Sequence, residues 1–141
     1  MQSSTDDVVS VTLTQYSLLP IIPQPGKYTV LSSFALRNPQ QSGRTHLLSL
    51  GTGVKCLPAS RLPPLGDALH DSHAEVIARR GAIRWFLEEV QRDVQAPGSS
   101  AWICARKEDG LYTLRDDVQL WMYASTVPCT FFQGLPTSLI F

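Results

Sequence analysis

The 141-residue sequence is long enough for one globular domain, and 43% of its residues are hydrophobic. Twelve Lys and Arg balance twelve Asp and Glu, which excludes a global positive field for nucleic acid, so any RNA binding must come from a local patch. Cysteines occur only at positions 56, 104 and 129, too few and too scattered for a disulfide framework, and they favour a reducing compartment. With no signal-peptide pattern and no stretch of membrane-spanning length, we expect an intracellular protein of cytoplasm or nucleus that makes no membrane contact.

The first half of the chain predicts an arm and a pair of strands. Residues 1–26 combine polar residues with a proline-rich turn and predict an irregular N-terminal arm. Residues 28–36 are rich in strand formers, and residues 46–50 read as their hairpin partner across a loop at 40–43. A second proline-rich stretch, 58–66, predicts a loop that separates the sheet from the next element.

The second half predicts a helix and two further strands. From Ser72 to about Asp93 the apolar spacing is helical, with apolar residues on two faces, which indicates a helix covered on both sides. Residues 96–100 end this helix, and residues 102–105 and 120–125 predict strands on either side of a turn at 108–110. The expected order is β-β-α-β-β, which makes this an α/β chain.

The run His-Asp-Ser-His-Ala-Glu-Val-Ile-Ala-Arg-Arg, residues 70–80, and the later Pro128-Cys129 contain parts of a zinc deaminase. Such an enzyme needs an acidified water and a carboxyl group that carries its proton to the departing amine. His73 is a candidate metal ligand, Glu75 a candidate proton carrier and Cys129 a candidate thiolate ligand.

Simpler interpretations of the same residues stay open. Ser72-x-x-Glu75 is also a capping box, with Ser72 as the helix N-cap, and Cys129 taken alone is more often a small buried hydrophobe. At least one of Arg79 and Arg80 is expected to point inward from so apolar a helix. That guanidinium needs an anionic partner, either a nearby carboxylate or a polyphosphate bound inside the fold.

The run at 70–80, preceded by Gly-Thr-Gly-Val-Lys-Cys at 51–56 and followed by Pro128-Cys129, resembles the tRNA-specific adenosine deaminase 1 family. That family is related to the adenosine deaminases that act on double-stranded RNA. The resemblance covers roughly residues 27–129 and leaves 130–141 as a divergent apolar tail. It implies a cytidine-deaminase-like three-layer α/β sandwich, of which this chain holds the N-terminal part. It also implies conversion of adenosine to inosine beside the anticodon of alanine tRNA, with tRNA and not DNA as the partner.

The resemblance assigns roles to particular residues. His73 and Cys129 match zinc ligands, and Glu75 matches the proton shuttle. Lys55 matches a position that faces the substrate backbone in the related double-stranded RNA enzymes. Arg79 and Arg80 match residues that bind inositol hexakisphosphate, and Asp71 matches a residue in the relay between that ligand and zinc.

The departures from the family pattern bear on activity. Val54 stands where the family usually has Thr, and Cys129 is followed by Thr130-Phe131 in place of the family's Gly-Asp-Ala-Ser. Residues 130–141 contain no Cys, His, Asp or Glu, so the third ligand of a catalytic zinc site is missing from this sequence. We therefore expect that this chain does not deaminate by itself. The alternative is a non-catalytic truncated isoform or fragment that binds RNA or a full-length partner, or is unstable.

The other cysteines are interpreted as structural. Cys56 and Cys104 are expected to be packing residues and not substitute zinc ligands, because neither occupies a ligand position of the family.

Overall fold

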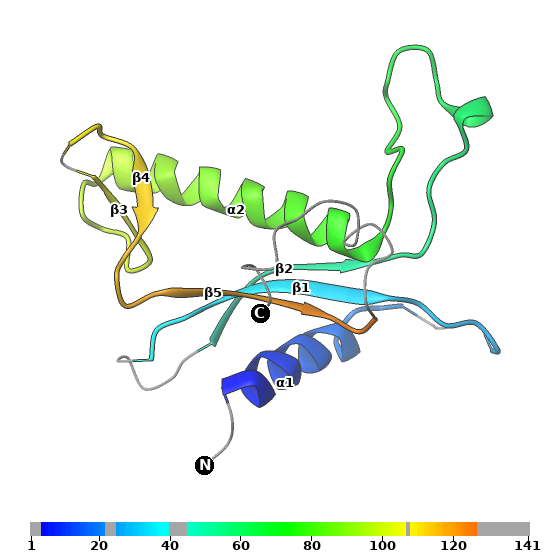
Figure 1. Cartoon of the computed structure of the whole chain (residues 1–141), viewed down its shortest axis with the longest axis horizontal. Helices are drawn as coiled ribbons and strands as arrows, with labels where there is room; N and C mark the ends of the chain where they lie inside the picture. The colour runs from blue at the N-terminus through cyan, green and yellow to red at the C-terminus, as the bar shows by residue number, and fades with distance from the viewer. Residues whose placement is uncertain (1–3, 22–24, 40–44, 107, 127–141) are drawn as a thin grey trace, which may run out of the picture.

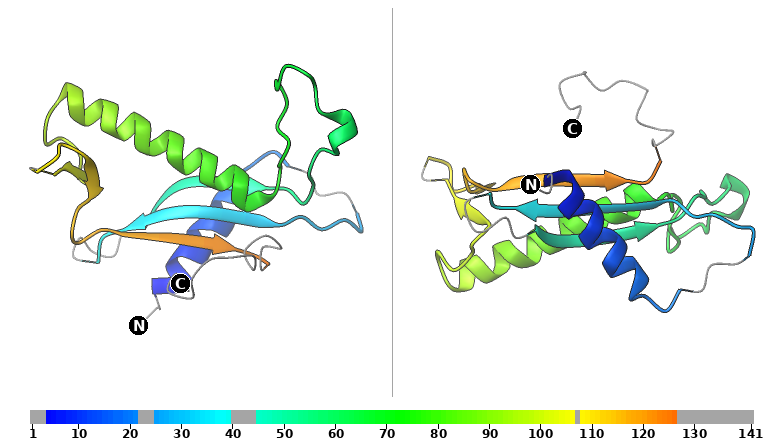
Figure 2. Two further views of the ribbon diagram at one scale, coloured as in Figure 1. Left: turned by 45° about the horizontal axis from the view of Figure 1, so that its top comes forward. Right: turned by 90° about the horizontal axis from the view of Figure 1, so that it is seen from below.

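The computed structural model describes residues 4–21, 25–39, 45–106 and 108–126, which form a mixed α/β arrangement. Strands β1 (Leu31–Arg37), β2 (Thr45–Thr52) and β5 (Gln119–Ala124) make an antiparallel three-stranded sheet in the order β2-β1-β5. Helix α2 (Ala74–Gln95) lies over one face of the sheet and helix α1 (Ser4–Ser17) over the other, as Figures 1 and 2 show. Strands β3 (Ile103–Ala105) and β4 (Tyr112–Leu114) pair with each other in a second, two-stranded antiparallel sheet. The 3-10 helix η1 (Ala59–Arg61) belongs to the segment of chain that connects β2 to α2.

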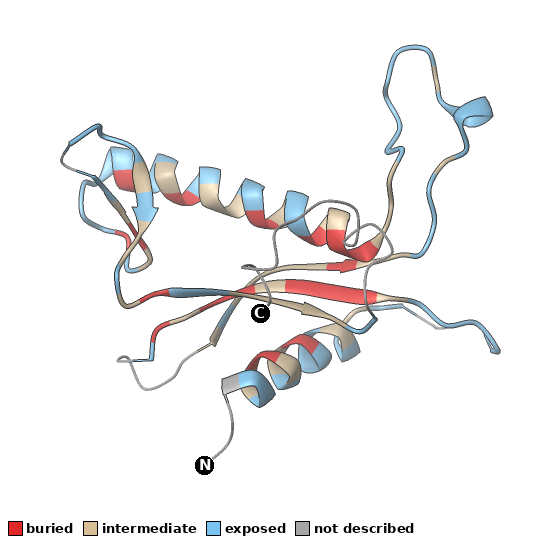
Figure 3. Ribbon diagram, in the orientation of Figure 1, coloured by how far each residue is buried: buried red, intermediate tan, exposed pale blue. Residues whose placement is uncertain are grey.

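The core lies between the central strand and the small-residue face of α2. Figure 3 shows buried residues along β1 and on the helix faces turned toward the sheet. On α2 this face is built from Ala74, Ala78 and Ala82, four residues apart, so the helix backbone approaches the sheet closely. At Gly51 in β2 an added Cβ would overlap the carbonyl oxygen of Ala74 and the amide nitrogen of Ala78. The glycine at 51 is therefore a packing requirement that seats the start of α2 on the sheet.

Most of the expected elements are present. The two N-terminal strands, the long helix and the strands near 102–105 and 120–125 lie within a few residues of their predicted bounds, and β4 is an additional strand. The loop expected at 40–43 lies outside the described residues. The strand pairing places β5, the last of the described strands, beside β1, the first of them. This adjacency joins segments far apart in sequence.

The expectation of an irregular arm is wrong for Ser4–Ser17, which form α1. Val8 and Thr12, one turn apart, are both buried against the sheet, and Thr12 Oγ1 lies 2.7 Å from Ser33 Oγ of β1. An ion pair of 3.2 Å joins Asp7 to Arg37. The sequence does not indicate this helix because its β-branched residues have weak helical propensity, and most of its stabilisation comes from tertiary packing.

The expectation that α2 is covered on two faces is also wrong in the described structure. Its outer face exposes Ile83, Leu87 and Val94, with Leu87 at 66%. Arg79 and Arg80 are both exposed, so neither guanidinium points inward. Because the alanine stripe faces the sheet, residues five and six positions after Ala74 turn toward solvent. No helix in the described ranges has the length and apolar character needed to cross a bilayer.

Candidate metal and catalytic site

The candidate site lies where the loop after β2 returns to the start of α2. An isolated antiparallel bridge pairs Cys56 with Asp71. The amide of Leu57 donates to the carbonyl of His70 at 2.6 Å, and the amide of Ser72 donates to the carbonyl of Lys55 at 3.1 Å. These backbone bonds hold the segment ending the Gly-Thr-Gly-Val-Lys-Cys motif beside the segment that leads into the helix.

Three side chains with metal-ligating atoms converge there. His73 Nδ1 lies 2.8 Å from Asp71 Oδ1 and 3.3 Å from Cys56 Sγ. The ligand atoms of the three residues all lie within 4.8 Å of one another, and no other such group of three occurs in the part of the chain that the structure describes. The side chains of His73 and Asp71 are 22% and 31% exposed, and Cys56 is exposed. A nitrogen, an oxygen and a sulfur donor at a half-open site suit a zinc-like cation.

Hydrogen bonds from His73 lower the pKa of the Asp71 carboxyl group. The backbone N–H of His73 donates to Asp71 Oδ1 at 3.0 Å, and this bond is the main reason that the pKa of the Asp71 carboxyl lies below its ordinary value. Partial burial acts in the opposite direction, while the His73 ring and the Cys56 thiol lower the pKa further. Asp71 is therefore a carboxylate at neutral pH and is able to orient the imidazole of His73.

The start of α2 differs from the capping-box interpretation, which is wrong. His73 and not Ser72 is the N-cap residue, and the side chain of His73 makes no capping hydrogen bond to the described helix. The first helical amide, at Ala74, donates instead to the carbonyl of Gly53 at 3.1 Å. The residue that follows β2 thus satisfies the first of the free amides at the start of the helix.

Glu75 follows His73 by two residues and is only 8% exposed. Among the described residues no hydrogen bond or ion pair engages its carboxyl group, and its carboxyl oxygens are not among the fully buried polar atoms that lack a partner. Glu75 is therefore a buried residue in the first turn of α2, two positions after His73 in the sequence, with no capping role.

Of the other predicted site residues, some lie on the surface near the site or on α2, and one lies outside the described residues. Lys55 is exposed on the loop immediately before Cys56, and Arg79 and Arg80 are exposed on α2. Cys129 lies outside the described residues. The prediction that Cys56 is a packing residue is wrong, since it is exposed beside the His73 ring. Cys56 and His73 are 17 residues apart, so their contact has no local sequence pattern. The only sequence signal for it is the small-residue motif that leads into Cys56.

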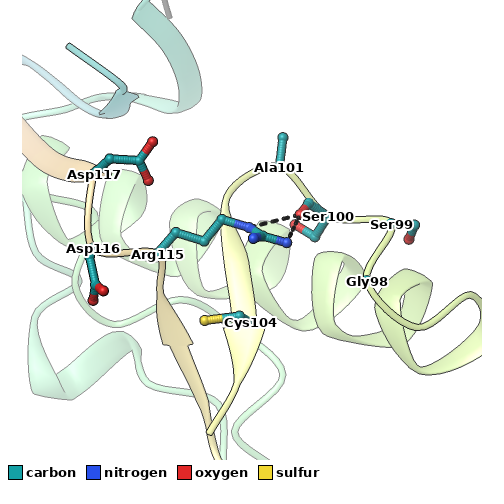
Figure 4. Close-up of a pocket in the computed structure, with 8 residues that line it drawn as sticks. All are labelled: Gly98, Ser99, Ser100, Ala101, Cys104, Arg115, Asp116 and Asp117. Atoms are coloured by element: carbon teal, nitrogen blue, oxygen red, sulfur yellow. Dashed lines mark hydrogen bonds between the residues drawn. The ribbon is translucent and has the colours of Figure 1, made fainter. Parts of the chain in front are cut away.

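A separate hollow of about 580 Å³ lies past the other end of α2 (Figure 4), lined by Gly98, Ser99, Ser100, Ala101, Cys104, Arg115, Asp116 and Asp117. The Arg115 guanidinium points across it and donates to the carbonyl of Ser100 at 2.8 and 3.1 Å. This arginine therefore connects the β3–β4 hairpin to the loop after α2. The hollow is remote from His73 and does not supply the chemistry of the candidate site.

The sequence around His73 is similar to that of known proteins. A family model described as the adenosine-deaminase (editase) domain matches residues 49–133, which include the whole candidate site. The chain is 39% identical over 83 residues to tRNA-specific adenosine deaminase 1 of Macaca fascicularis, covering 59% of this chain and 16% of the relative. It is 31% identical over 133 residues to the Saccharomyces cerevisiae protein of the same name, covering 88% of this chain and 33% of the relative.

A further relative acts on a different class of RNA by its name. The double-stranded RNA-specific adenosine deaminase of Rattus norvegicus is 31% identical over 105 residues, which cover 74% of this chain and 9% of the relative. The chain thus spans a third or less of the length of each of these three relatives. Because the family match covers more than half of the sequence and includes the run with His73 and Glu75, the chain belongs to the adenosine-deaminase (editase) domain family.

Proposed function

We propose that this chain is part of an RNA adenosine deaminase that converts adenosine to inosine in tRNA. The observation that carries the proposal is Glu75: a buried carboxylate without a capping role, two residues from His73, inside the region that the family model matches. The names of the relatives support tRNA as the substrate class.

The donor chemistry of the site fits zinc, because an imidazole nitrogen and thiol sulfurs are its usual ligands. His73 and Cys129 would hold the ion in the family's manner, and zinc bound there would acidify a water molecule. Glu75 then accepts a proton and delivers it to the departing amine of the adenine ring. Asp71 keeps the His73 ring oriented through the 2.8 Å hydrogen bond.

Finer assignments belong to the same proposal. The substrate is alanine tRNA next to its anticodon, and the complete domain has the cytidine-deaminase-like sandwich. Lys55, exposed beside the site, contacts the RNA backbone. Arg79 and Arg80 bind inositol hexakisphosphate, with Asp71 in the relay to zinc. The support for the arginines is that both guanidinium groups remain accessible on α2.

The 141-residue chain by itself is expected to be inactive, because the family pattern supplies only two zinc ligands in this sequence. The second candidate function is therefore a non-catalytic chain that binds RNA or a full-length partner. The exposed apolar face of α2 favours this alternative, since such a surface is unusual on an independent monomer.

A chimera tests the catalytic assignment separately from the completeness of the chain. Residues 49–126 replace the aligned segment of the Saccharomyces cerevisiae relative, and inosine is measured in an alanine tRNA transcript. We expect the chimera to make inosine and Glu75→Gln to lower the rate at least about a hundredfold, because general acid–base catalysis is lost. Glu88→Gln, an exposed acid on the same helix, serves as the matched control and keeps the rate.

Equal loss in both glutamine variants, or full activity with Glu75→Gln, contradicts the role of Glu75. The 141-residue chain alone should form no inosine. Inosine formation by the chain alone, abolished by Glu75→Ala, would overturn the expected inactivity.

A further inference from the structure

The sulfur of Cys56 is held beside His73 by the backbone. The bridge between Cys56 and Asp71, with the two hydrogen bonds of 2.6 and 3.1 Å that flank it, fixes the direction of both chain segments. The backbone amide of His73 is tied to Asp71 Oδ1 at 3.0 Å. The backbone therefore holds all three donor residues close together at the N-terminus of α2. Gly51 and Gly53 let this part of the chain approach β2 closely, because an added Cβ at either position would overlap backbone atoms of residues 72–78.

The separation of the His73 nitrogen and the Cys56 sulfur is close to that of two ligands in a zinc coordination shell. With Zn–N of about 2.05 Å and Zn–S of about 2.3 Å in tetrahedral geometry, the nitrogen and sulfur ligands lie about 3.6 Å apart. His73 Nδ1 and Cys56 Sγ are 3.3 Å apart. The 2.8 Å contact with Asp71 Oδ1 is that of a hydrogen bond, and it must lengthen by about half an ångström to reach ligand spacing. Side chains at 22% and 31% exposure have room for that movement.

We propose that Cys56, Asp71 and His73 form a three-donor site for Zn²⁺ or a similar borderline cation, with Cys56 as a thiolate ligand outside the family pair His73 and Cys129. On binding, the metal–sulfur bond replaces the S–H bond and the thiol proton leaves to solvent. Three protein ligands leave one coordination position open for water or a fourth ligand. This site and the deaminase site use His73 in different ways and are alternatives in one chain, and this proposal does not depend on deamination.

The competing arrangement is that of the proposed deaminase site, in which the 2.8 Å hydrogen bond between His73 and Asp71 is kept. In it, the protonated Nδ1 of His73 donates to Asp71, the ring presents only Nε2 to a metal, and Cys56 takes no part. The two arrangements differ in whether sulfur from Cys56 enters the coordination shell.

Cobalt(II), which reports thiolate ligation through a near-ultraviolet charge-transfer band, distinguishes them in single-cysteine chains. The sequence has three cysteines, so Cys104→Ser with Cys129→Ser leaves only Cys56. We expect this chain to bind one equivalent of Co²⁺ with the charge-transfer band, and the band to disappear when His73→Ala or Cys56→Ser is added. The mirrored chain, Cys56→Ser with Cys104→Ser, retains only the family ligand Cys129 and reports on the proposed deaminase site independently.

Absence of the band in the Cys56-only chain, whose fold is checked by circular dichroism, overturns the proposal. If the charge-transfer band occurs only in the chain that retains Cys129, the proposal for Cys56 is overturned and the deaminase assignment is not affected.

A second measurement uses the unaltered chain. Iodoacetamide alkylation of each cysteine is followed by peptide mass spectrometry with and without Zn²⁺. At a zinc concentration ten times the dissociation constant, we expect Cys56 to react about tenfold more slowly, because only a minor fraction stays metal-free. Cys104, which lies in the remote hollow, is the internal control and should be unaffected. Equal rates for Cys56 with and without zinc contradict the proposal.

Discussion

Gly51 illustrates how one residue positions the candidate site. An added Cβ there would overlap the Ala74 carbonyl and the Ala78 amide, and these backbone atoms cannot rotate away. Gly51→Ala must therefore push the start of α2, with His73 and Glu75, off strand β2. We expect a loss of about 3 kcal/mol in the free energy of unfolding, the upper end for overpacking, measured by urea denaturation.

Gly66→Ala is the control for this substitution. Gly66 has φ +69° and no heavy atom within 4 Å of an added Cβ. Gly66→Ala should lower the free energy of unfolding by only about 1 kcal/mol, the cost of an alanine in the left-handed conformation. An equal or smaller loss at Gly51 would show that the close approach of helix and strand is not tight.

At the same scale, the sequence predicted part of the site. The spacing of His73 and Glu75 was sufficient to identify them as candidates, because both lie in one continuous run. Cys56 was misinterpreted, since its contact with His73 depends on the fold of the loop between β2 and α2. Local pattern cannot report a contact across 17 residues.

The packing of α1 on the sheet depends on a buried pair of hydroxyl groups. Thr12 Oγ1 and Ser33 Oγ are 2.7 Å apart, and both residues are fully buried. Thr12→Val leaves the Ser33 hydroxyl without that partner and should lower the free energy of unfolding by about 1–2 kcal/mol. In a double-mutant cycle with Ser33→Ala, we expect the double variant to lose less than the sum of the singles, with a coupling of about 1 kcal/mol.

Strict additivity of the two substitutions would mean that the hydroxyl pair does not stabilise α1 on the sheet. The single variants also test the existence of α1, which the sequence did not predict.

The C-terminal end of α2 is joined to the β3–β4 hairpin by Tyr112, whose hydroxyl donates to Asp93 Oδ2 at 3.2 Å. Burial, and then the bond to this carboxylate, raise the pKa of Tyr112 above 10.0. Because the folded pKa exceeds the unfolded one, this stabilisation is present below the unfolded pKa and is lost as pH rises through the folded value. Tyr112→Phe should therefore have a lower urea midpoint than the wild type at about pH 8, and the difference should shrink above about pH 10.

Tyr28→Phe is the matched control, since Tyr28 is 84% exposed. Its midpoint should equal that of the wild type at both pH values. A Tyr112→Phe difference that persists unchanged at high pH would contradict the raised pKa.

The whole molecule presents an apolar surface on the outer face of α2, where Leu87 and Val94 are 66% and 64% exposed. Strands β2 and β5 are the two edges of the described three-stranded sheet, which adds unpaired backbone groups. We expect the purified chain to bind a hydrophobic dye and to self-associate as its concentration rises. Leu87→Glu should reduce dye fluorescence and association without lowering the unfolding midpoint.

Leu65→Glu provides the comparison, because Leu65 is 92% exposed on the loop between β2 and α2 and away from this face. An equal reduction by both variants would show that dye binding does not report on the α2 face.

The sequence by itself determined the α/β character, most strand and helix positions, and the family, because these depend on local periodicity and on one continuous motif. Only the tertiary structure decided that residues 4–17 are a helix, that Arg79 and Arg80 face solvent, and that Glu75 is not part of a cap. It also decided that Cys56 lies beside His73. These outcomes depend on which surfaces meet across the sheet and the loop, and burial and hydrogen bonding between distant segments select among local alternatives of similar energy.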